Sequence, residues 1–407
     1  MTWNENSPTF PGMRISAVRA TPVNIPFHAP YRFSLGSTAS VTKTIVEVDT
    51  DEGVTGIGEC ADGDRSAEIA RLGERLTGLD PLDLNECERR CVPAFEHSLW
   101  ENVTTLRRAF GAIEMALWDL RGRAEDKPLH LLLGGAVRRE IAFTEYFALR
   151  HPGTSHPGES TPLELARYCA RMIEEYDSPS FEGKLATVGL DEELEMVREV
   201  RAAIGERPLR LDANHAWTVP TARDVLRRLA PYDIRCIEEP VGSHEELARL
   251  RPFTDIAFSA HAPDLRRAVA LGVPDFYVLN LVELGGIRRT VEFVRACEQF
   301  GIGFWFHSGD TGVASAAYLQ VSAALEPIRE PSQALFHWYG DDVIAQGPFC
   351  PRRGVLPVPD GPGLGVTLDP GALARCHGRF LAEGAFPSGE EGVPERTRGS
   401  FGALRRS

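Results

Sequence analysis

The sequence contains few cysteines and no paired cysteine motif. Eight cysteines occur in 407 residues, and none forms a Cys-x-x-Cys pair. Cys87 and Cys91 are one helical turn apart, but no second pair completes a zinc site. A small module held together by disulfides is therefore excluded, and free thiols are typical of a reducing compartment.

Export and membrane signals are also lacking. No run of 18 apolar residues occurs, and the amino-terminal MTWNENSPTFPG has no basic segment followed by an apolar one. We therefore expect a cytoplasmic protein with no membrane partner.

Positive charge is in deficit. Lys and Arg number 44 against 58 Asp and Glu, which gives a net charge of −14 that repels nucleic acid. Neither a Gly-x-Gly-x-x-Gly turn nor a phosphate-binding loop occurs, so nucleotide binding is not predicted. Hydrophobic residues at 43% indicate an ordinary globular protein with a large core. A small anionic substrate would need local positive charge from a metal or a lysine.

The first third of the chain predicts an α+β domain over residues 1–135. Residues 15–59 alternate in short runs around the Asp51-Glu52-Gly53 turn, which is typical of an antiparallel meander. Helical periodicity follows over 64–76, 82–95 and 103–125.

Residues 136–340 repeat a different unit, an apolar strand followed by an amphipathic helix. The eight predicted strands are IAFTEYFAL, SFEGKLA, LRLDAN, IRCIEEP, IAFSAH, FYVLNL, IGFWFH and, as the weakest, QALFHW. Eight such runs favour an α/β fold with a closed parallel barrel, and an open doubly wound sheet is the alternative. The repeat ends near residue 341, and the composition of 386–407 predicts a mobile tail.

Polar residues follow the predicted strands at regular intervals. In a parallel barrel the carboxyl ends of the strands share one mouth, so these side chains are expected to converge on one site. They are Lys184, Asp212, Asn214, Glu238, His261, Asn280 and His307.

Three of these residues end consecutive strands and predict a metal site. Asp212 and Glu238 supply carboxylates and His261 supplies an imidazole. Because oxygen donors predominate, Mg²⁺ is favoured, with Mn²⁺ as a second possibility. Taken singly, Asp212 is better explained as a helix N-cap and Glu238 as a salt-bridged strand end, and it is their common phase that favours a metal.

Lys184 and His307 are the candidates for proton transfer. Lys184 ends the strand before the first carboxylate, and His307 ends a strand almost opposite it in the barrel. Asp310 follows in the SGDTG loop, where it would orient His307, contact the substrate or simply cap a helix.

Further substrate contacts are expected from outside this series. Tyr31 and Arg32 lie in the loop 28–36, which a capping domain would bring over the barrel mouth. His337 ends the weak eighth strand, where substrate contact and packing are equally open.

Several motifs resemble the mandelate racemase and muconate lactonizing branch of the enolase superfamily. They are AIEMALWDLRGRAEDKPLHLLLGG at 112–135, TIVEVDTDEGVTGIGE at 44–59, and the strand ends LDAN and IEEP. The resemblance implies a modified (β/α)₇β barrel with an N-terminal α+β capping domain, to which residues 341–385 return. It also implies a Mg²⁺ ion that stabilises an enediolate, and a homo-oligomer.

Within that branch, the composition around FHSGDTG is most similar to acid-sugar dehydratases related to glucarate dehydratase. This resemblance implies Asp212 and Glu238 as metal ligands, with His261 at a third position where the family more often has Asn, Asp or Glu. It implies that Asn214 helps to hold the substrate or the ligand shell. Lys184 matches the first lysine of the family's Lys-x-Lys pair.

His307 matches the catalytic histidine of these dehydratases, but two of its expected partners differ. Ala186 replaces the second lysine, and Asn280 replaces the aspartate that orients the histidine. An asparagine can orient an imidazole but cannot stabilise an imidazolium as a carboxylate does. The expected function is metal-dependent dehydration of a sugar acid, a small carboxylate substrate, through α-proton abstraction and an enediolate. The alternatives are a hydroxy-acid epimerase or racemase and a non-catalytic carboxylate-binding protein.

Overall fold

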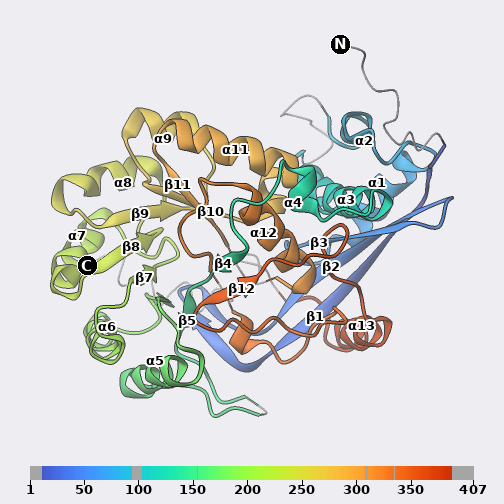
Figure 1. The fold of residues 1–407 in the computed structure, drawn as a ribbon. Helices are drawn as coiled ribbons and strands as arrows, with labels where there is room; N and C mark the ends of the chain where they lie inside the picture. The colour runs from blue at the N-terminus through green and yellow to red at the C-terminus, as the bar shows by residue number, and fades with distance from the viewer. Residues whose placement is uncertain (1–11, 94–102, 154, 308–309, 334, 387–407) are drawn as a thin grey trace.

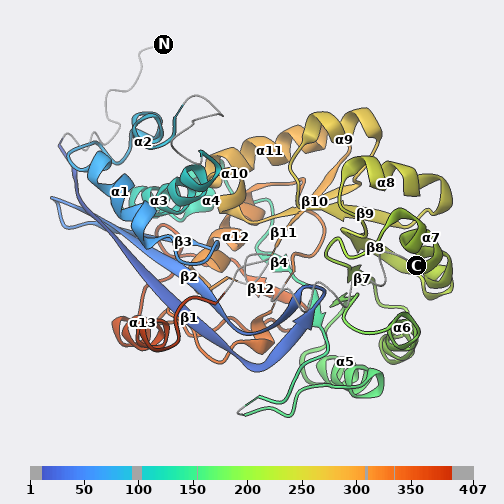
Figure 2. The ribbon, with the colours of Figure 1, turned by 180° about the vertical axis from the view of Figure 1, so that it is seen from behind.

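An antiparallel sheet packs beside a parallel one in the computed structural model, which describes residues 12–93, 103–153, 155–307, 310–333 and 335–386 (Figures 1 and 2). The antiparallel sheet has the order β1 (Ile15–Phe33), β2 (Gly36–Thr50), β3 (Thr55–Cys60). The two faces of β2 are buried in different cores, since Ile45 packs into the barrel-side core and Val46 and Val48 into the core beneath the helices. The predicted meander is therefore confirmed.

Helices cover the outer face of this antiparallel sheet. α1 (Ser66–Leu76) and α3 (Val103–Ala124) pack on the sheet, and α2 (Leu84–Cys91) packs on these two helices. The short α4 (Leu129–Leu132) follows α3 and packs on α3 and on α12 (Gly312–Ala324) of the barrel. All three predicted helices are present, and the expected extension of the second to residues 94–95 lies outside the described residues. β3 approaches α3 closely at Gly58, where an added Cβ would lie 2.2 Å from the carbonyl oxygen of Ala112.

The parallel sheet contains seven strands in the order β11-β10-β9-β8-β7-β6-β5. The strands are β5 (Glu145–Phe147), β6 (Phe181–Lys184), β7 (Leu209–Asp212), β8 (Ile234–Glu238), β9 (Ala257–Ala260), β10 (Phe276–Leu279) and β11 (Gly303–Phe306). They are short and almost wholly buried, as expected for strands covered on both sides. Neighbouring strands follow the chain order, so the sheet curls as a barrel does.

Helices follow each barrel strand, as the repeat predicts. They are α5 (Pro162–Tyr176), α6 (Leu190–Ile204), α7 (Val219–Leu229), α8 (His244–Leu250), α9 (Leu265–Leu271), α10 (Leu281–Leu284), α11 (Ile287–Gln299) and α12 (Gly312–Ala324). Single 3₁₀ turns, η1 (Ala230–Tyr232) and η2 (Arg251–Phe253), follow α7 and α8. Among the described residues, no helix has the length and hydropathy needed to cross a membrane.

The prediction of an eighth strand over 333–338 is wrong. The barrel is instead closed by Ser332 and Gln333: Ser332 N donates to Ala142 O at 2.9 Å, and Gln333 N donates to Phe306 O at 3.0 Å. The chain then turns into the 3₁₀ helix η3 (Phe336–Trp338). This turn lets Phe336 and Trp338 pack into two separate cores, which a continuing strand would not permit.

The first predicted barrel strand, IAFTEYFAL, is divided in the structure. Its first part forms β4 (Glu140–Ala142), which pairs with β12 (Val355–Pro357), and only β5 joins the barrel. After β12 the chain returns to the antiparallel sheet, where α13 (Pro370–Glu383) packs on β1 (Figure 1). The predicted mobile tail, apart from Phe386, lies outside the described residues.

Candidate active site

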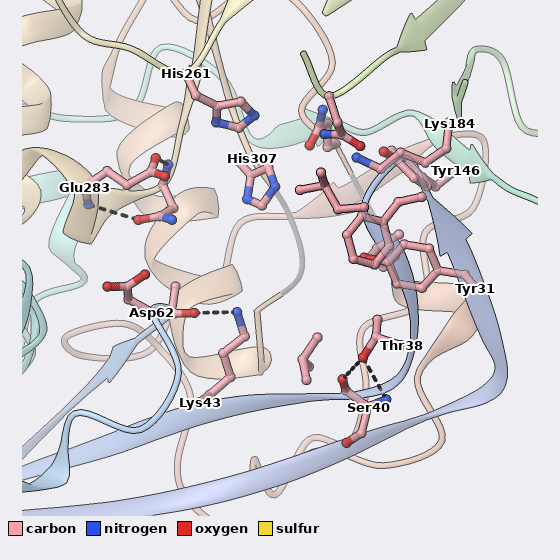
Figure 3. A pocket seen from close by; sticks show the side chains of 18 of the residues that line it. Tyr31, Thr38, Ser40, Lys43, Asp62, Tyr146, Lys184, His261, Glu283 and His307 are labelled. Carbon is pink, nitrogen blue, oxygen red and sulfur yellow. Dashed lines mark hydrogen bonds between the residues drawn. The ribbon is translucent and has the colours of Figure 1, made fainter. Parts of the chain in front are cut away.

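A pocket of about 370 Å³ lies between the antiparallel sheet and the carboxyl ends of the barrel strands (Figure 3). Six of the predicted site residues line it: Tyr31, Lys184, Asn214, His261, Asn280 and His307. In Figure 3, His261 and His307 lie on one side of the pocket, and Lys184, Tyr146 and Tyr31 on the other. The pocket therefore brings together five of the seven strand-end residues with Tyr31 of β1. Asp212 and Glu238 are not among the residues that line it.

Lys184 forms a buried ion pair with Asp212 on the neighbouring strand. The residues end β6 and β7, which pair in register, and the Nζ of Lys184 contacts Oδ2 of Asp212. Burial alone would lower the pKa of Lys184, but Asp212 and Tyr146 outweigh it and raise that pKa well above its usual value. Lys184 is consequently an ammonium that can bind a carboxylate.

Glu238 is held from both sides at the end of β8. Its Oε1 lies 2.8 Å from Nε2 of His261, and its Oε2 accepts a hydrogen bond of 2.6 Å from Gln333. Burial first, and then the adjacent Asp212, raise the pKa of Glu238 above its usual range. Asp212 and Glu238 are thus two buried carboxyl groups on adjacent strands, and a nearby positive charge would stabilise their ionised forms.

Backbone strain is concentrated just after these strands. Ala186, Asn214, His215 and Glu239 all have positive φ, at 57°, 45°, 57° and 41°. Such conformations are unfavourable for residues other than glycine and gather at functional sites. At Asn214 the strained turn leaves the buried side-chain oxygen Oδ1 without a hydrogen-bond partner among the described residues.

His307 directly follows β11 and is half-buried. Its Nδ1 has no hydrogen-bond partner among the described residues, and its ring lies 5.0 Å from that of His261. Burial, reinforced by the positive charges of His261, Lys184 and Lys43, lowers the pKa of His307 well below its usual value. His307 lines the pocket as a neutral imidazole, and its Nδ1 is a buried nitrogen without a partner among the described residues.

Asn280 lines the pocket but does not orient His307 through Oδ1. That oxygen accepts hydrogen bonds of 3.0 Å from the backbone N–H groups of Val282 and Glu283, which makes Asn280 the N-cap of α10. An asparagine after a strand and before a helix is well suited to this capping role. The predicted role of Asn280 toward His307 stays a prediction.

Three predicted substrate contacts are not among the residues that line the pocket. Arg32 donates to the carbonyl oxygen of Thr187 at 2.6 Å and so joins β1 to the loop after β6. Asp310 is buried in an ion pair with Lys43 at 2.8 Å. His337 lies on η3 beside Glu145, the first residue of β5, which places it at the opposite end of the barrel.

The donor set fits a divalent ion in part. Asp212, Glu238 and the unpartnered Oδ1 of Asn214 are oxygen donors of the kind that Mg²⁺ prefers. His261 does not complete this set, because its Nε2 faces Glu238 and because Glu239 and Glu238, against the effect of burial, raise its pKa to about 10. Within the described ranges, no group of three His, Cys, Asp or Glu side chains is arranged around one metal position.

Several lining residues were not predicted from the sequence. Lys43, Asp62 and Arg108 come from the antiparallel sheet and its helices, and Tyr146 comes from the interior of β5. None ends a barrel strand, so the spacing gave no signal for them. Gln333 also lines the pocket, and its place directly after the last barrel segment was the one available clue.

Two family models match this chain. The model described as "Mandelate racemase / muconate lactonizing enzyme, N-terminal domain" covers residues 15–134, and that described as "Enolase C-terminal domain-like" covers 164–372. The chain belongs to the mandelate racemase and muconate lactonizing branch of the enolase superfamily. The resemblance stated from its motifs is confirmed, and so is the barrel with a capping domain.

Relatives in the enolase superfamily carry out more than one reaction. A probable glucarate dehydratase of Streptomyces coelicolor is 26% identical over 91% of this chain and 92% of its own length. A chloromuconate cycloisomerase of Pseudomonas putida is 27% identical over 89% and 98%. An enolase of Pseudomonas fluorescens, solved with bound magnesium, potassium and tartrate, superposes with a TM-score of 0.84 at 27% identity over 92% of this chain and 94% of that one. Membership thus establishes an enzyme superfamily that uses Mg²⁺ and small carboxylates, with the reaction still to be assigned.

Proposed function

We propose that this protein is a carbon–oxygen lyase that dehydrates a sugar acid, by abstraction of the α-proton and an enediolate intermediate. The observation that carries the proposal is that His307, a neutral imidazole whose Nδ1 has no hydrogen-bond partner in the part of the chain that the structure describes, lines one pocket with the ammonium of Lys184. The proton acceptor and the carboxylate-binding cation lie on different sides of one cavity. The glucarate dehydratase relative and the hydroxy acid tartrate in the Pseudomonas fluorescens structure support this substrate class.

In this mechanism Lys184 binds the substrate carboxylate, which withdraws charge from the α-carbon. Asp212 and Glu238, with Oδ1 of Asn214, would hold the Mg²⁺ ion, which when bound supplies charge stabilisation to the enediolate. His307 accepts the α-proton and returns it to the leaving β-hydroxyl. We assign both transfers to His307 because Ala186, which stands at the position of the second lysine, cannot act as a base.

The capping sheet positions the substrate above these groups. We propose that residues 1–135 and 341–385 form a cap over a barrel made of 136–340, since α13 returns to pack on β1. Tyr31 lines the pocket from β1, and Arg32 fixes that strand end to the loop after β6. Closure of this kind excludes water from the enediolate.

The test is proton NMR of the protein with Mg²⁺ and a set of acid sugars in D₂O. Loss of the α-proton signal together with new methylene signals of a 2-keto-3-deoxy acid would support the proposal and identify the substrate. Exchange of the α-proton without methylene signals would replace it with epimerase chemistry. No exchange in a broad set, with bound metal demonstrated, would favour a carboxylate-binding protein.

His307→Asn tests the assigned base. We expect turnover to fall by at least about 100-fold, the scale of general acid–base catalysis, with unchanged substrate binding measured by calorimetry. His151→Asn is the matched control, because His151 is an exposed histidine outside the pocket. Turnover in His307→Asn equal to that of the control would contradict the role.

A further inference from the structure

The end of the barrel away from the pocket carries a second cluster of reactive side chains. Glu145 begins β5, His337 lies on η3, and Cys350 lies in the segment before β12. Glu145 is buried and His337 is partly buried, with side chains 7% and 10% exposed. All eight cysteines fall in the described residues, and Cys350 is exposed while the other seven are buried.

Glu145 fixes the orientation of the His337 ring. Its carboxylate accepts hydrogen bonds from Tyr168 Oη at 2.9 Å and from Ser178 Oγ at 3.0 Å, and lies 2.9 Å from Nδ1 of His337. With two hydroxyl donors already present, the carboxylate requires Nδ1 to be a donor as well. In the neutral ring the proton therefore lies on Nδ1, and Nε2 carries the lone pair.

That lone pair is directed at the exposed thiol. Nε2 of His337 lies 3.6 Å from Sγ of Cys350, within hydrogen-bonding distance for sulfur. The ring is also held from one face by Tyr176, which stacks on it at 4.0 Å between centroids. A carboxylate, an oriented imidazole and a thiol thus stand in the order that nucleophilic cysteine sites use.

We propose that Cys350, His337 and Glu145 form a thiol-modification site that reacts with small disulfides, separate from the pocket and independent of the proposed dehydratase activity. As Sγ attacks one sulfur of the disulfide RSSR, Nε2 of His337 takes the thiol proton. A new S–S bond joins Cys350 to SR and the old S–S bond breaks. The departing thiolate takes the proton back from His337 and leaves as RSH.

The charges around Cys350 explain why it needs the base. Burial, together with Glu145 and against the effect of Arg352, raises the pKa of the Cys350 thiol, so the sulfur is protonated near neutral pH. The charged or titratable groups that face His337 and Cys350 are Glu145, Tyr168, Tyr176 and Arg352. Nε2 of His337 lies within hydrogen-bonding distance of Sγ, which makes this imidazole the group placed to accept the thiol proton.

The experiment measures the rate at which oxidised glutathione forms a mixed disulfide with the intact protein, followed by mass spectrometry and peptide mapping. We expect one glutathione on Cys350 and none in Cys350→Ser. At pH 7.5, His337→Asn should react at least about tenfold more slowly, with His151→Asn unchanged as the control. The difference should shrink towards pH 10, where the thiolate forms without a base. Equal rates in wild type and His337→Asn at pH 7.5, or attachment at another cysteine, would overturn the proposal.

A second measurement needs no variant. The rate at Cys350 in the folded protein is compared with the rate in the urea-unfolded chain at the same pH. A thiol that is merely shielded reacts more slowly when folded, whereas the proposed site reacts faster. A slower rate in the folded protein would overturn the proposal even if His337→Asn failed to fold.

Discussion

At the scale of single residues, the pocket is built from opposite charges that neutralise one another before any ligand binds. Lys184 pairs with Asp212, His261 with Glu238, and Lys43 with Asp310. When a substrate carboxylate binds Lys184 and a cation binds Asp212, the ion pair between Lys184 and Asp212 is replaced by two new ion pairs. Ligand and metal are therefore expected to bind cooperatively, because each releases the partner that the other needs.

The position of His261 gives a prediction about metal affinity. In His261→Asp, the cation that competes for Glu238 is replaced by a carboxylate oxygen, so Mg²⁺ should bind at least about tenfold more tightly. Isothermal titration calorimetry with Mg²⁺ and with Mn²⁺ measures the change. If His261 instead ligates the metal through nitrogen, the wild type would prefer Mn²⁺ and the substitution would lose that preference.

At the scale of elements, the close approach of β3 to α3 depends on residues without a side chain. The ideal Cβ of an alanine at position 58 would lie 2.2 Å from Ala112 O and 2.9 Å from Ala116 N, both backbone atoms that cannot rotate away. Strand and helix must separate to accommodate it.

Gly58→Ala should therefore lower the free energy of unfolding by about 1–3 kcal/mol, the usual cost of overpacking. Chemical denaturation measures this difference. Gly189→Ala is the matched control, since nothing lies within 4 Å of its added Cβ. Equal stability of the two variants would show that α3 moves freely on the sheet.

Glu114 joins α3 to the amino terminus of α11. Its carboxylate accepts from Ile287 N at 2.7 Å, Arg288 N at 3.0 Å and Trp118 Nε1 at 2.8 Å. Burial nevertheless outweighs these donors and raises the pKa of Glu114 to about 7, from 4.5 when it is solvated. The folded state thus binds this proton more tightly than the unfolded state.

The resulting stabilisation is complete below about pH 4.5 and is lost as the pH rises through about 7. We expect Glu114→Gln to reduce the decline in unfolding free energy between pH 5 and pH 8 by about 3 kcal/mol. Denaturant titrations across this range test it, with Glu74→Gln on an exposed face of α1 as the control. A decline as steep as in the control would mean that Glu114 is already ionised at pH 5.

The element scale also shows what the sequence could and could not predict. Lys184, Asp212, Glu238, His261 and His307 were predicted because strand ends recur at one strand–helix interval and share one mouth, and three of them, Lys184, His261 and His307, line the pocket. The role of Asn280 as a helix N-cap depends on α10, a single short helix that hydrophobic periodicity does not reveal. The position of His337 depends on a turn that forms because its aromatic neighbours pack into two cores. The pocket residues from the capping domain depend on tertiary contacts that no local sequence pattern encodes.

At the scale of the whole molecule, the cap and the barrel are joined by buried polar contacts. Lys43 of β2 pairs with Asp310 and donates to Ala61 O at 2.9 Å, and Glu59 of β3 accepts from Thr311 N at 2.9 Å and Ala314 N at 2.8 Å. The residues anchored in this way begin at Asp310, three positions after His307. The cap is therefore part of the structure that positions the proposed base.

Lys43→Met should leave Asp310 as an uncompensated buried carboxylate and destabilise the protein by about 3–5 kcal/mol. The double variant Lys43→Met with Asp310→Asn should recover part of this loss, since no buried charge is then unpaired. Hydrogen exchange should rise in β2 and β3 more than in β7 and β8. A uniform rise would show that the pair does not hold the cap in particular.

Closure of the barrel by Ser332 and Gln333 has a consequence for folding. The amide of Gln333 donates at 2.6 Å to both Glu182 and Glu238, so the residue that seals the ring also fastens a proposed ligand. Because only two residues close the barrel, few hydrogen bonds must break there, and we expect the barrel to open first at this point under thermal fluctuation. Each opening would bare two strand edges that invite association with other chains. A metal ion or ligand that binds Glu238 in the closed barrel should therefore also delay aggregation.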